Sequence, residues 1–391
     1  MPDNKHITVA AWPTAAWYTE KLGRGVPNPI TGSRDECARY DQDLSRLLYE
    51  ELGEFGLGSA NPEPDCGVPL HETYHVIATA YGAPPPAWDE RTGSFWLDRN
   101  ACPWAGLSSL SEVEKIPVPD WRSHPMVQED MGKLAVARQT LGAERLRTVP
   151  IGDMEFVWTH PGTGRSYRLS HFPEFLDMGL VLMGSTPFFT TLAADHELAG
   201  ALMQKCFEIS ASYNDFMTAA CGRPREGWCS MGGNPACLVS ADMYRQYAME
   251  FDALVRAKCG NVPRNLHSCG PSRHLYGVWA EYPERDQIVL MQTRAIPGAM
   301  APLRRSLPHT YIQLTIHQPQ VDFERESPGR VKDLVWEFAE ALGFRDMSIT
   351  VLFSWVDERV RANLAALFEA GEDVNAEAAS RAVVMKWCCA G

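Results

Sequence analysis

Short apolar and β-branched runs alternate with longer segments of helical period along most of this chain. Such alternation is typical of βα units, in which each strand of a parallel sheet is followed by a helix that covers it. About eight runs of this kind are present, which matches the eight strands of a (β/α)8 barrel. The sequence therefore predicts an α/β protein with the TIM-barrel fold. The predicted strands are residues 6–13, 55–60, 148–160, 226–233, 263–270, 287–296, 310–318 and 347–355.

The whole chain, residues 1–391, is predicted to be one barrel domain with an excursion around residues 64–145. Within the excursion, the runs at 74–82 (YHVIATAYG) and 94–99 (SFWLDR) predict an inserted hairpin, and the Pro-rich remainder predicts a capping segment. Residues 372–391 are expected to form a C-terminal tail. The main predicted helices are residues 43–55, 195–217, 240–260, 327–343 and 357–372.

The charge balance limits the kinds of molecule that this protein is expected to bind. Lys and Arg number 36 against 49 Asp and Glu, which gives a formal net charge of −13. Such a surface is poorly suited to nucleic-acid phosphates or to an anionic membrane. The longest uncharged stretch, residues 178–194, has Gly-Ser-Thr-Pro at its centre and predicts two helices joined by a turn rather than a membrane span. We expect a small-molecule substrate, and we leave open a homodimer.

Eleven cysteines are present, none of them in a CxxC motif. The first residues, MPDNKHITVAAWPTAAWYTEK, lack the basic start and apolar run of a secretory signal. We therefore expect a cytoplasmic protein with reduced thiols, in which most cysteines are small buried apolar residues and a minority bind metal or do chemistry.

Active sites of α/β barrels lie where the strands end, so polar residues at these positions are candidates for function. Arg294 is a candidate catalytic group that could bind a substrate carboxylate, and His317 is a candidate metal ligand or acid–base group. The candidate substrate-binding residues are Asn234, His160 and Trp355, which lie at the ends of other predicted strands.

His267 and Cys269 are the most specific pair among these candidates. Alternate residues of a strand point the same way, so this imidazole and this thiol would project together into the barrel mouth. One nitrogen and one sulfur ligand suit a tetrahedral zinc ion, which usually takes at least three protein ligands. The third could come from Cys229, Cys237, His317 or the terminal pair Cys388-Cys389, and spacing alone does not decide between them.

The segment NLHSCGPSRHL at 265–275 resembles the H-x-C-G segment of the uroporphyrinogen decarboxylase superfamily, and is most similar to its zinc-dependent methyltransferase branch. The segments at 187–209, 240–255 and 327–343 resemble that superfamily's helices in the same order and spacing, whereas the first 140 residues match loosely. The resemblance implies a barrel whose zinc ion is held by the residues that correspond to His267 and Cys269, and by a cysteine at the end of the last strand.

The last predicted strand, SITVLFSWVDE, has no cysteine at its end. Either the tail folds back so that Cys388 or Cys389 supplies the ligand, or a group such as His317 substitutes, or the metal site is altered or lost. The resemblance implies that zinc activates a substrate thiol for attack on a methylated corrinoid such as methylcobalamin. The chain has no D-x-H-x-x-G corrinoid-ligand motif, so the methyl donor would be external, bound to a separate corrinoid protein or free.

Two other functions are considered. The first is a decarboxylase or other lyase that acts without metal and uses Arg294 to hold a carboxylated substrate. Decarboxylation of a porphyrinogen itself ranks below methyl transfer, because the arginine-rich N-terminal segment that this activity needs is absent, with Arg24 the only arginine before Arg34. The second is a non-catalytic metal-binding accessory protein.

Overall fold

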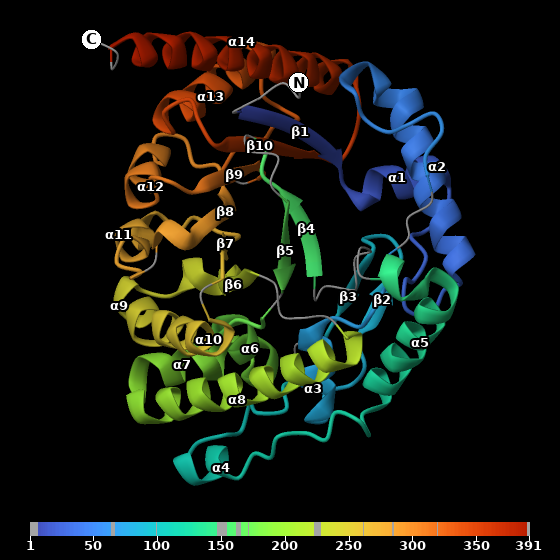
Figure 1. The fold of residues 1–391 in the computed structure, drawn as a ribbon, viewed down its shortest axis with the longest axis vertical. Helices are drawn as coiled ribbons and strands as arrows, with labels where there is room; N and C mark the ends of the chain where they lie inside the picture. Colours follow the sequence, from blue (N-terminus) through green and yellow to red (C-terminus); the bar gives the residue numbers. More distant parts are fainter. Residues whose placement is uncertain are drawn as a thin grey trace.

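The structure, a computed structural model, describes residues 7–63, 67–98, 100–146, 155–161, 166–170, 172–222, 228–260, 262–283, 285–318 and 320–388. Eight strands form one curved sheet in the order β1-β10-β9-β8-β7-β6-β5-β4 (Figure 1). Pairing is parallel from β1 round to β5, and β4 runs antiparallel to β5. The α/β class is confirmed. The first strand lies beside the last, as in a barrel, but no pairing between β1 and β4 closes a ring within the described residues.

The predicted strands correspond to strands of the sheet, with the exception of 55–60. The sequence did not predict β5, which is short and largely polar. The strands of the sheet are β1 (Ile7–Pro13), β4 (Glu155–Thr159), β5 (Ser166–Ser170), β6 (Trp228–Gly232), β7 (Arg264–Ser268), β8 (Ile288–Arg294), β9 (Tyr311–Ile316) and β10 (Met347–Phe353).

Helices connect the neighbouring parallel strands from β5 to β10, a long helix follows β10, and together these helices cover the outer side of the curved sheet (Figure 1). These are α6 (Phe175–Met183), α7 (Ser185–Ala194), α8 (His196–Cys221), α9 (Ala241–Met243), the π-helical η4 (Tyr244–Met249), α10 (Glu250–Cys259), α11 (Tyr276–Trp279), α12 (Met300–Ser306), α13 (Pro328–Ala341) and α14 (Glu358–Cys388). Ser327 caps α13 by accepting a hydrogen bond from the Arg330 backbone N–H, which explains why this helix begins where it does.

The excursion between β1 and β4 contains helices and one small hairpin. Its elements are α1 (Ala15–Leu22), α2 (Arg34–Leu52), α3 (Thr73–Ala80), β2 (Ala87–Asp89), β3 (Ser94–Trp96), α4 (Leu110–Glu114) and α5 (Pro125–Leu146). In Figure 1, α2 and α5 lie on the side of the molecule opposite α9–α12.

Three local predictions are wrong. The run at 74–82 is the helix α3, because a short apolar run that is buried on all sides, here including Val76 and Ile77, has no period that separates helix from strand. The run at 55–60 is a turn, since Gly56 and Gly58 both adopt positive φ. Most of the predicted tail at 372–391 continues α14 as helix.

The two faces of the sheet differ in chemistry. Outward-facing residues such as Leu266, Leu314 and Val351 belong to the main hydrophobic core beneath the helices. Inward-facing residues of β7, β8 and β9 are mostly polar, because alternate residues of a strand point to opposite faces. At the N-terminal end of these strands a separate apolar cluster, Leu290 with Tyr311, packs against Trp158 of β4 and Val289.

Above that cluster lies a layer of side-chain amides. Asn265 Nδ2 donates to Gln292 Oε1 at 3.1 Å, and Gln292 Nε2 donates to Gln313 Oε1 at 3.1 Å. The three residues come from β7, β8 and β9, and this ladder fixes their side chains in one plane. The next inward-facing residues toward the strand ends are His267 and Arg294. The interior is therefore layered, as in TIM barrels, with polar groups toward the C-terminal ends.

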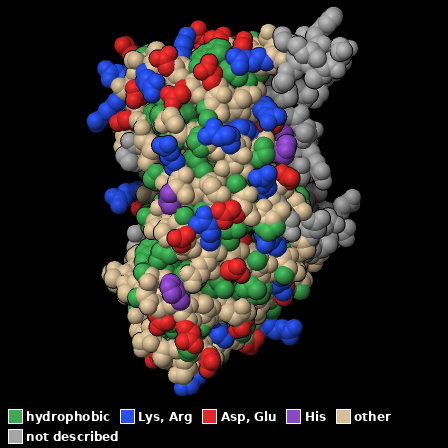
Figure 2. Space-filling model, turned by 90° about the vertical axis from the view of Figure 1, so that its left-hand side faces the viewer, with side chains coloured by type: hydrophobic (Ala, Val, Ile, Leu, Met, Phe, Trp, Pro, Cys, Tyr) green, Lys and Arg blue, Asp and Glu red, His purple; other side chains and the backbone are tan. Residues whose placement is uncertain are grey.

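Among the described residues, no helix combines the length and the apolarity that crossing a membrane requires. Figure 2 shows the face covered by the outer helices, on which basic and acidic side chains are interspersed. Arg245 on this part of the chain pairs with Asp242 at 2.8 Å and with Glu281 at 2.8 Å. Pairs of this kind keep the charge mixed rather than gathered into patches of one sign.

A buried polar cluster lies between α10 and the outer side of the sheet. Tyr282 Oη donates to Asp252 Oδ2 at 2.5 Å, and the Tyr244 and Tyr282 hydroxyls are 3.1 Å apart. Burial raises the pKa of Asp252 to about 7; the charge of Glu174 acts in the same direction, and the Tyr282 hydrogen bond, Arg256 and Arg264 oppose it.

This pKa predicts a pH dependence of stability. Between pH 4 and pH 7 the unfolded chain has lost the Asp252 proton while the native protein retains it, so native stability falls as pH rises through this window. We expect the free energy of unfolding of the wild type, relative to an Asp252→Asn variant, to drop by about 4 kcal/mol from pH 4 to pH 7.5. Urea unfolding of both proteins across this range measures it. A difference that stays constant or grows with pH contradicts the prediction.

Candidate functional site

The ends of three neighbouring strands bring the candidate site together. β6, β7 and β8 are parallel, with Gly232 beside His267 and Ser268 beside Thr293. The residues that follow the strands therefore meet at one edge of the sheet. Asn234 begins the short 3₁₀ helix η3 (Asn234–Leu238) after β6, and Cys269 follows β7 directly.

Asn234, His267 and Cys269 form a triangle of polar atoms. His267 Nε2 lies 2.8 Å from Cys269 Sγ and 3.1 Å from Asn234 Oδ1. The Cys269 thiol donates to the same Asn234 Oδ1 at 2.7 Å. A nitrogen, a sulfur and an oxygen thus point at one another. Cys269 as a whole residue is exposed to solvent, whereas its thiol is partly buried. The predicted pairing of His267 with Cys269 is confirmed as a geometric neighbourhood, with Asn234 beside it.

Asp177, which the sequence analysis did not single out, fixes the orientation of Asn234. The Asn234 backbone N–H donates to Asp177 Oδ2 at 3.0 Å, and its side-chain Nδ2 donates to Asp177 Oδ1 at 3.2 Å. Because the amide nitrogen faces this carboxylate, Oδ1 must face His267 and Cys269. Asp177 lies in the first turn of α6. No strand ends there, so a search of strand ends could not find it.

Gly233 makes this contact possible. Its φ is +110°, which side chains with a Cβ rarely adopt, and a Cβ at this position would overlap Asp177 Oδ2. Any larger residue between β6 and Asn234 would therefore push the Asp177 carboxylate away from the Asn234 amide.

Arg294 supports the site from the end of β8. Its Nε donates to the backbone carbonyl of Cys269 and its Nη1 to that of Gln318 at 2.9 Å. Its charge also acts on the thiol. Burial is the largest cause of the raised pKa of Cys269; the charge of Arg294 lowers that pKa, and the charges of Asp177, Cys237 and Glu174 raise it further.

His317 and Trp355 line a neighbouring cavity of about 290 Å³ at the ends of β9 and β10. His317 Nδ1 lies 2.8 Å from the Gln318 carbonyl oxygen. Ser354, directly after β10, donates its backbone N–H to Glu324. Gln318 links this cavity to Arg294, so the catalytic and substrate-binding candidates of these strands share one edge of the sheet.

His160 does not reach that edge. The expectation that it lies beside the other candidates at the strand ends is therefore wrong. It follows β4, which is antiparallel to β5, so the C-terminal end of β4 lies at the opposite edge. There the His160 ring packs edge-on against Tyr311 and Trp158, with centroids 5.2 and 5.3 Å away.

The third metal ligand remains a prediction. Within the described part of the chain, no group of three or more His, Cys, Asp or Glu side chains is placed to hold a metal ion. His317 and Cys237 therefore do not complete a site with His267 and Cys269. Cys389 lies outside the described residues, and the side chain of Cys388 is not described either.

Compared with known proteins, the chain matches no family model, and a search of curated proteins finds no match. The resemblance stated above thus depends on the quoted segments alone.

The close packing of Gly270 against Cys237 predicts that substitutions at these two positions are coupled in their effect on stability. A Cβ at Gly270 would lie 2.6 Å from the Cys237 Cβ and would overlap its sulfur. We expect Gly270→Ala to cost about 1–3 kcal/mol of stability through overpacking. Because Cys237→Gly removes the clashing atoms, the double variant is expected to be at least about 1 kcal/mol more stable than the sum of the single effects.

Urea unfolding of the wild type, both single variants and the double variant measures this coupling. Gly132→Ala serves as the control, because a Cβ there meets nothing within 4 Å. Simple additivity of the two changes would show that Cys237 does not restrict Gly270.

Proposed function

We propose that the protein is a metal-dependent methyl or alkyl transferase that activates a thiol or a similar nucleophile at the strand ends, with zinc as the metal. The observation that carries this proposal is the convergence of His267 Nε2, Cys269 Sγ and Asn234 Oδ1 within 3.1 Å of one another. Of these residues, His267 and Cys269 lie in the segment at 265–275 that resembles the zinc-dependent methyltransferases.

The chemistry of the three donor atoms fits a zinc ion. Imidazole nitrogen and thiolate sulfur are its common ligands. Asp177 accepts hydrogen bonds from the backbone N–H and from the side-chain Nδ2 of Asn234. The Asn234 side chain therefore presents its acceptor oxygen, Oδ1, to His267 and Cys269. When Cys269 is deprotonated, the lone pairs of nitrogen, sulfur and oxygen face one another, and a cation offsets their repulsion. His267 and Cys269 would hold the metal, and either Asn234 or Cys389 would complete the protein ligands.

A bound zinc ion would lower the pKa of a substrate thiol, so that the thiolate is available near neutral pH. Arg294 would then bind an anionic group of the substrate. Its guanidinium donates to two carbonyl oxygens and forms no ion pair with a carboxylate in the described residues. The methyl group would come from methylcobalamin or from a separate corrinoid protein.

Metal analysis of three variants tests this proposal. Wild-type protein purified with zinc is expected to hold about one equivalent, and His267→Ala and Cys269→Ser are expected to lose it. Cys37→Ser, which changes a cysteine on the distant helix α2, is the matched control and should retain the metal. Zinc-free wild type, or variants that bind as well as the wild type, would refute a metal site here.

Turnover then separates the functions that share a metal site. Methyl transfer from methylcobalamin to a thiol, followed by the corrinoid absorbance change, is expected for wild type and abolished in both metal-site variants. Stoichiometric zinc without turnover under any of these conditions favours the non-catalytic accessory protein.

The orientation of Asn234 makes a second prediction. Asp177→Ala removes the carboxylate that turns the Asn234 oxygen toward His267 and Cys269, so zinc affinity is expected to fall 10- to 100-fold. Competition with a chromophoric chelator measures the affinity. The control is Asp195→Ala, which removes the N-cap of α8 and reports the effect of losing an acidic residue at a helix start. Equal affinities in the wild type and Asp177→Ala would exclude this orienting role.

A metal-free lyase is the second candidate, and the charge of Arg294 favours it. A guanidinium that forms no ion pair among the described residues, at the edge that holds His317, is suited to a carboxylated substrate. Carbon dioxide release that is insensitive to chelators and to Cys269→Ser, but is lost in Arg294→Gln, would select this function over methyl transfer.

A further inference from the structure

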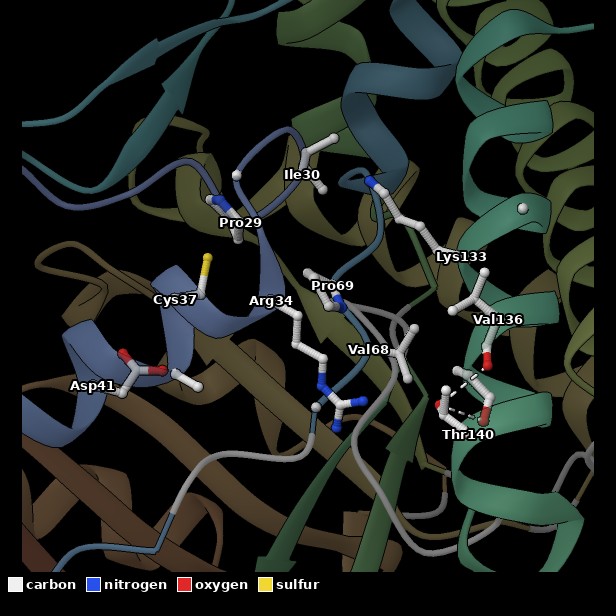
Figure 3. A pocket seen from close by; sticks show the side chains of 15 residues that line it. Pro29, Ile30, Arg34, Cys37, Asp41, Val68, Pro69, Lys133, Val136 and Thr140 are labelled. Atoms are coloured by element: carbon white, nitrogen blue, oxygen red, sulfur yellow. Dashed lines mark hydrogen bonds between the residues drawn. The ribbon is translucent and has the colours of Figure 1, made fainter.

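A cavity of about 590 Å³ lies away from the strand ends. It is enclosed by the loop before α2, the first turns of α2, residues 67–69 and one face of α5 (Figure 3). None of the candidate residues of the site described above lines it. Its volume is within the range of small-molecule sites, about 300–1,000 Å³.

The walls of this cavity are largely apolar. Figure 3 shows Pro29 and Cys37 on one side and Lys133 and Val136 on the other. Val136 remains 60% exposed although it is a large aliphatic residue on a helix. Residues 132, 133, 136, 137 and 140 follow helical spacing, so α5 presents one continuous face to the cavity. An exposed apolar wall inside a concavity is a typical lining for a hydrocarbon group.

Two cationic groups border the same space. Arg34, in the first turn of α2, extends toward Val68 in Figure 3 and forms no ion pair or hydrogen bond within the described part of the chain. The Lys133 ammonium is 3.2 Å from Glu129 Oε1, yet its buried Nζ finds no hydrogen-bond partner there. The one acidic residue of the lining, Asp41, has an interaction of its own.

The positive charges of Arg34 and Lys133 contrast with the negative net charge of the protein as a whole. In a chain of net charge −13, two cationic groups lie beside one apolar cavity: Arg34, which has no partner in the described part of the chain, and Lys133, whose ion pair with Glu129 lacks hydrogen-bond geometry. Glu129 offsets part of the charge of Lys133, and an anionic ligand that reaches the buried ammonium would supply the hydrogen bond that this ion pair lacks. A hydrocarbon would occupy the apolar walls, and its charged end would meet Arg34 and Lys133.

We propose that this cavity is a second ligand site, which binds a small amphipathic carboxylate, an apolar chain that ends in an anionic group. The site is independent of the transferase proposal, because it shares no residue with the strand ends.

Decanoate is the probe, with decanol as its uncharged counterpart. Isothermal titration calorimetry is expected to give saturable decanoate binding at one site, below the concentration at which decanoate forms micelles, and at least tenfold weaker binding of decanol. Arg34→Gln and Lys133→Met are each expected to weaken decanoate about tenfold and to leave decanol unchanged, as loss of one charge-assisted contact predicts. Arg39→Gln, on the same helix but outside the cavity, is the matched control and should bind as the wild type does.

Cys37 lines the cavity, so the reactivity of its thiol shows directly whether decanoate binds there. Decanoate is expected to slow its alkylation by iodoacetamide, mapped by mass spectrometry, while Cys269 at the strand ends reacts at an unchanged rate. Gly132→Leu places a side chain in the cavity from a helix position where a Cβ meets nothing within 4 Å, so it should fold and abolish both binding and protection.

Three results would overturn the proposal. Equal affinities for decanoate and decanol would show that the cations do not select an anion. Protection of Cys269 instead of Cys37 would place the ligand at the strand ends. Binding that Gly132→Leu leaves intact, with the variant shown to be folded by circular dichroism, would exclude the cavity.

Discussion

Parallel pairing of neighbouring strands is the constraint on which the rest of this structure depends. Because β6 to β10 run the same way, their C-terminal ends meet at one edge, and residues far apart in the sequence become neighbours there. The alternation of side chains then separates two environments. Apolar residues face the outer helices, and the inward face carries the amide ladder of Asn265, Gln292 and Gln313 below the strand-end groups.

Hydrogen bonds within that ladder and to the Asp177 carboxylate fix the side-chain orientations in and below the candidate site. Asp177 turns the Asn234 oxygen toward His267 and Cys269, and Arg294 holds the backbone at Cys269. The site is thus held by groups on α6, β7 and β8 together. Such support from neighbouring groups is what a catalytic or metal-binding geometry needs to remain precise. The apolar cavity between α2 and α5 has a different chemistry, with mostly apolar walls and the cationic groups of Arg34 and Lys133 at its border.

The sequence predicted the strand–helix alternation well, because period-two and period-3.6 patterns arise from local geometry. It also placed His267 and Cys269 together, since the extended backbone at the end of β7 brings residues two positions apart to the same face. It failed where local pattern is ambiguous: the buried run of α3 has no distinguishing period, and the antiparallel direction of β4, which carries His160 to the far edge, is a property of pairing rather than of composition.

By itself, then, the sequence determined the α/β class, most strand positions and the His267–Cys269 pair, because each depends on residues close together in the chain. Only the tertiary structure decided that Asn234 completes their triangle, that Asp177 orients it, and that Arg34 and Lys133 border one cavity. These contacts join residues separated by tens of positions. Their formation depends on how strands pair and helices pack, which no local spacing encodes.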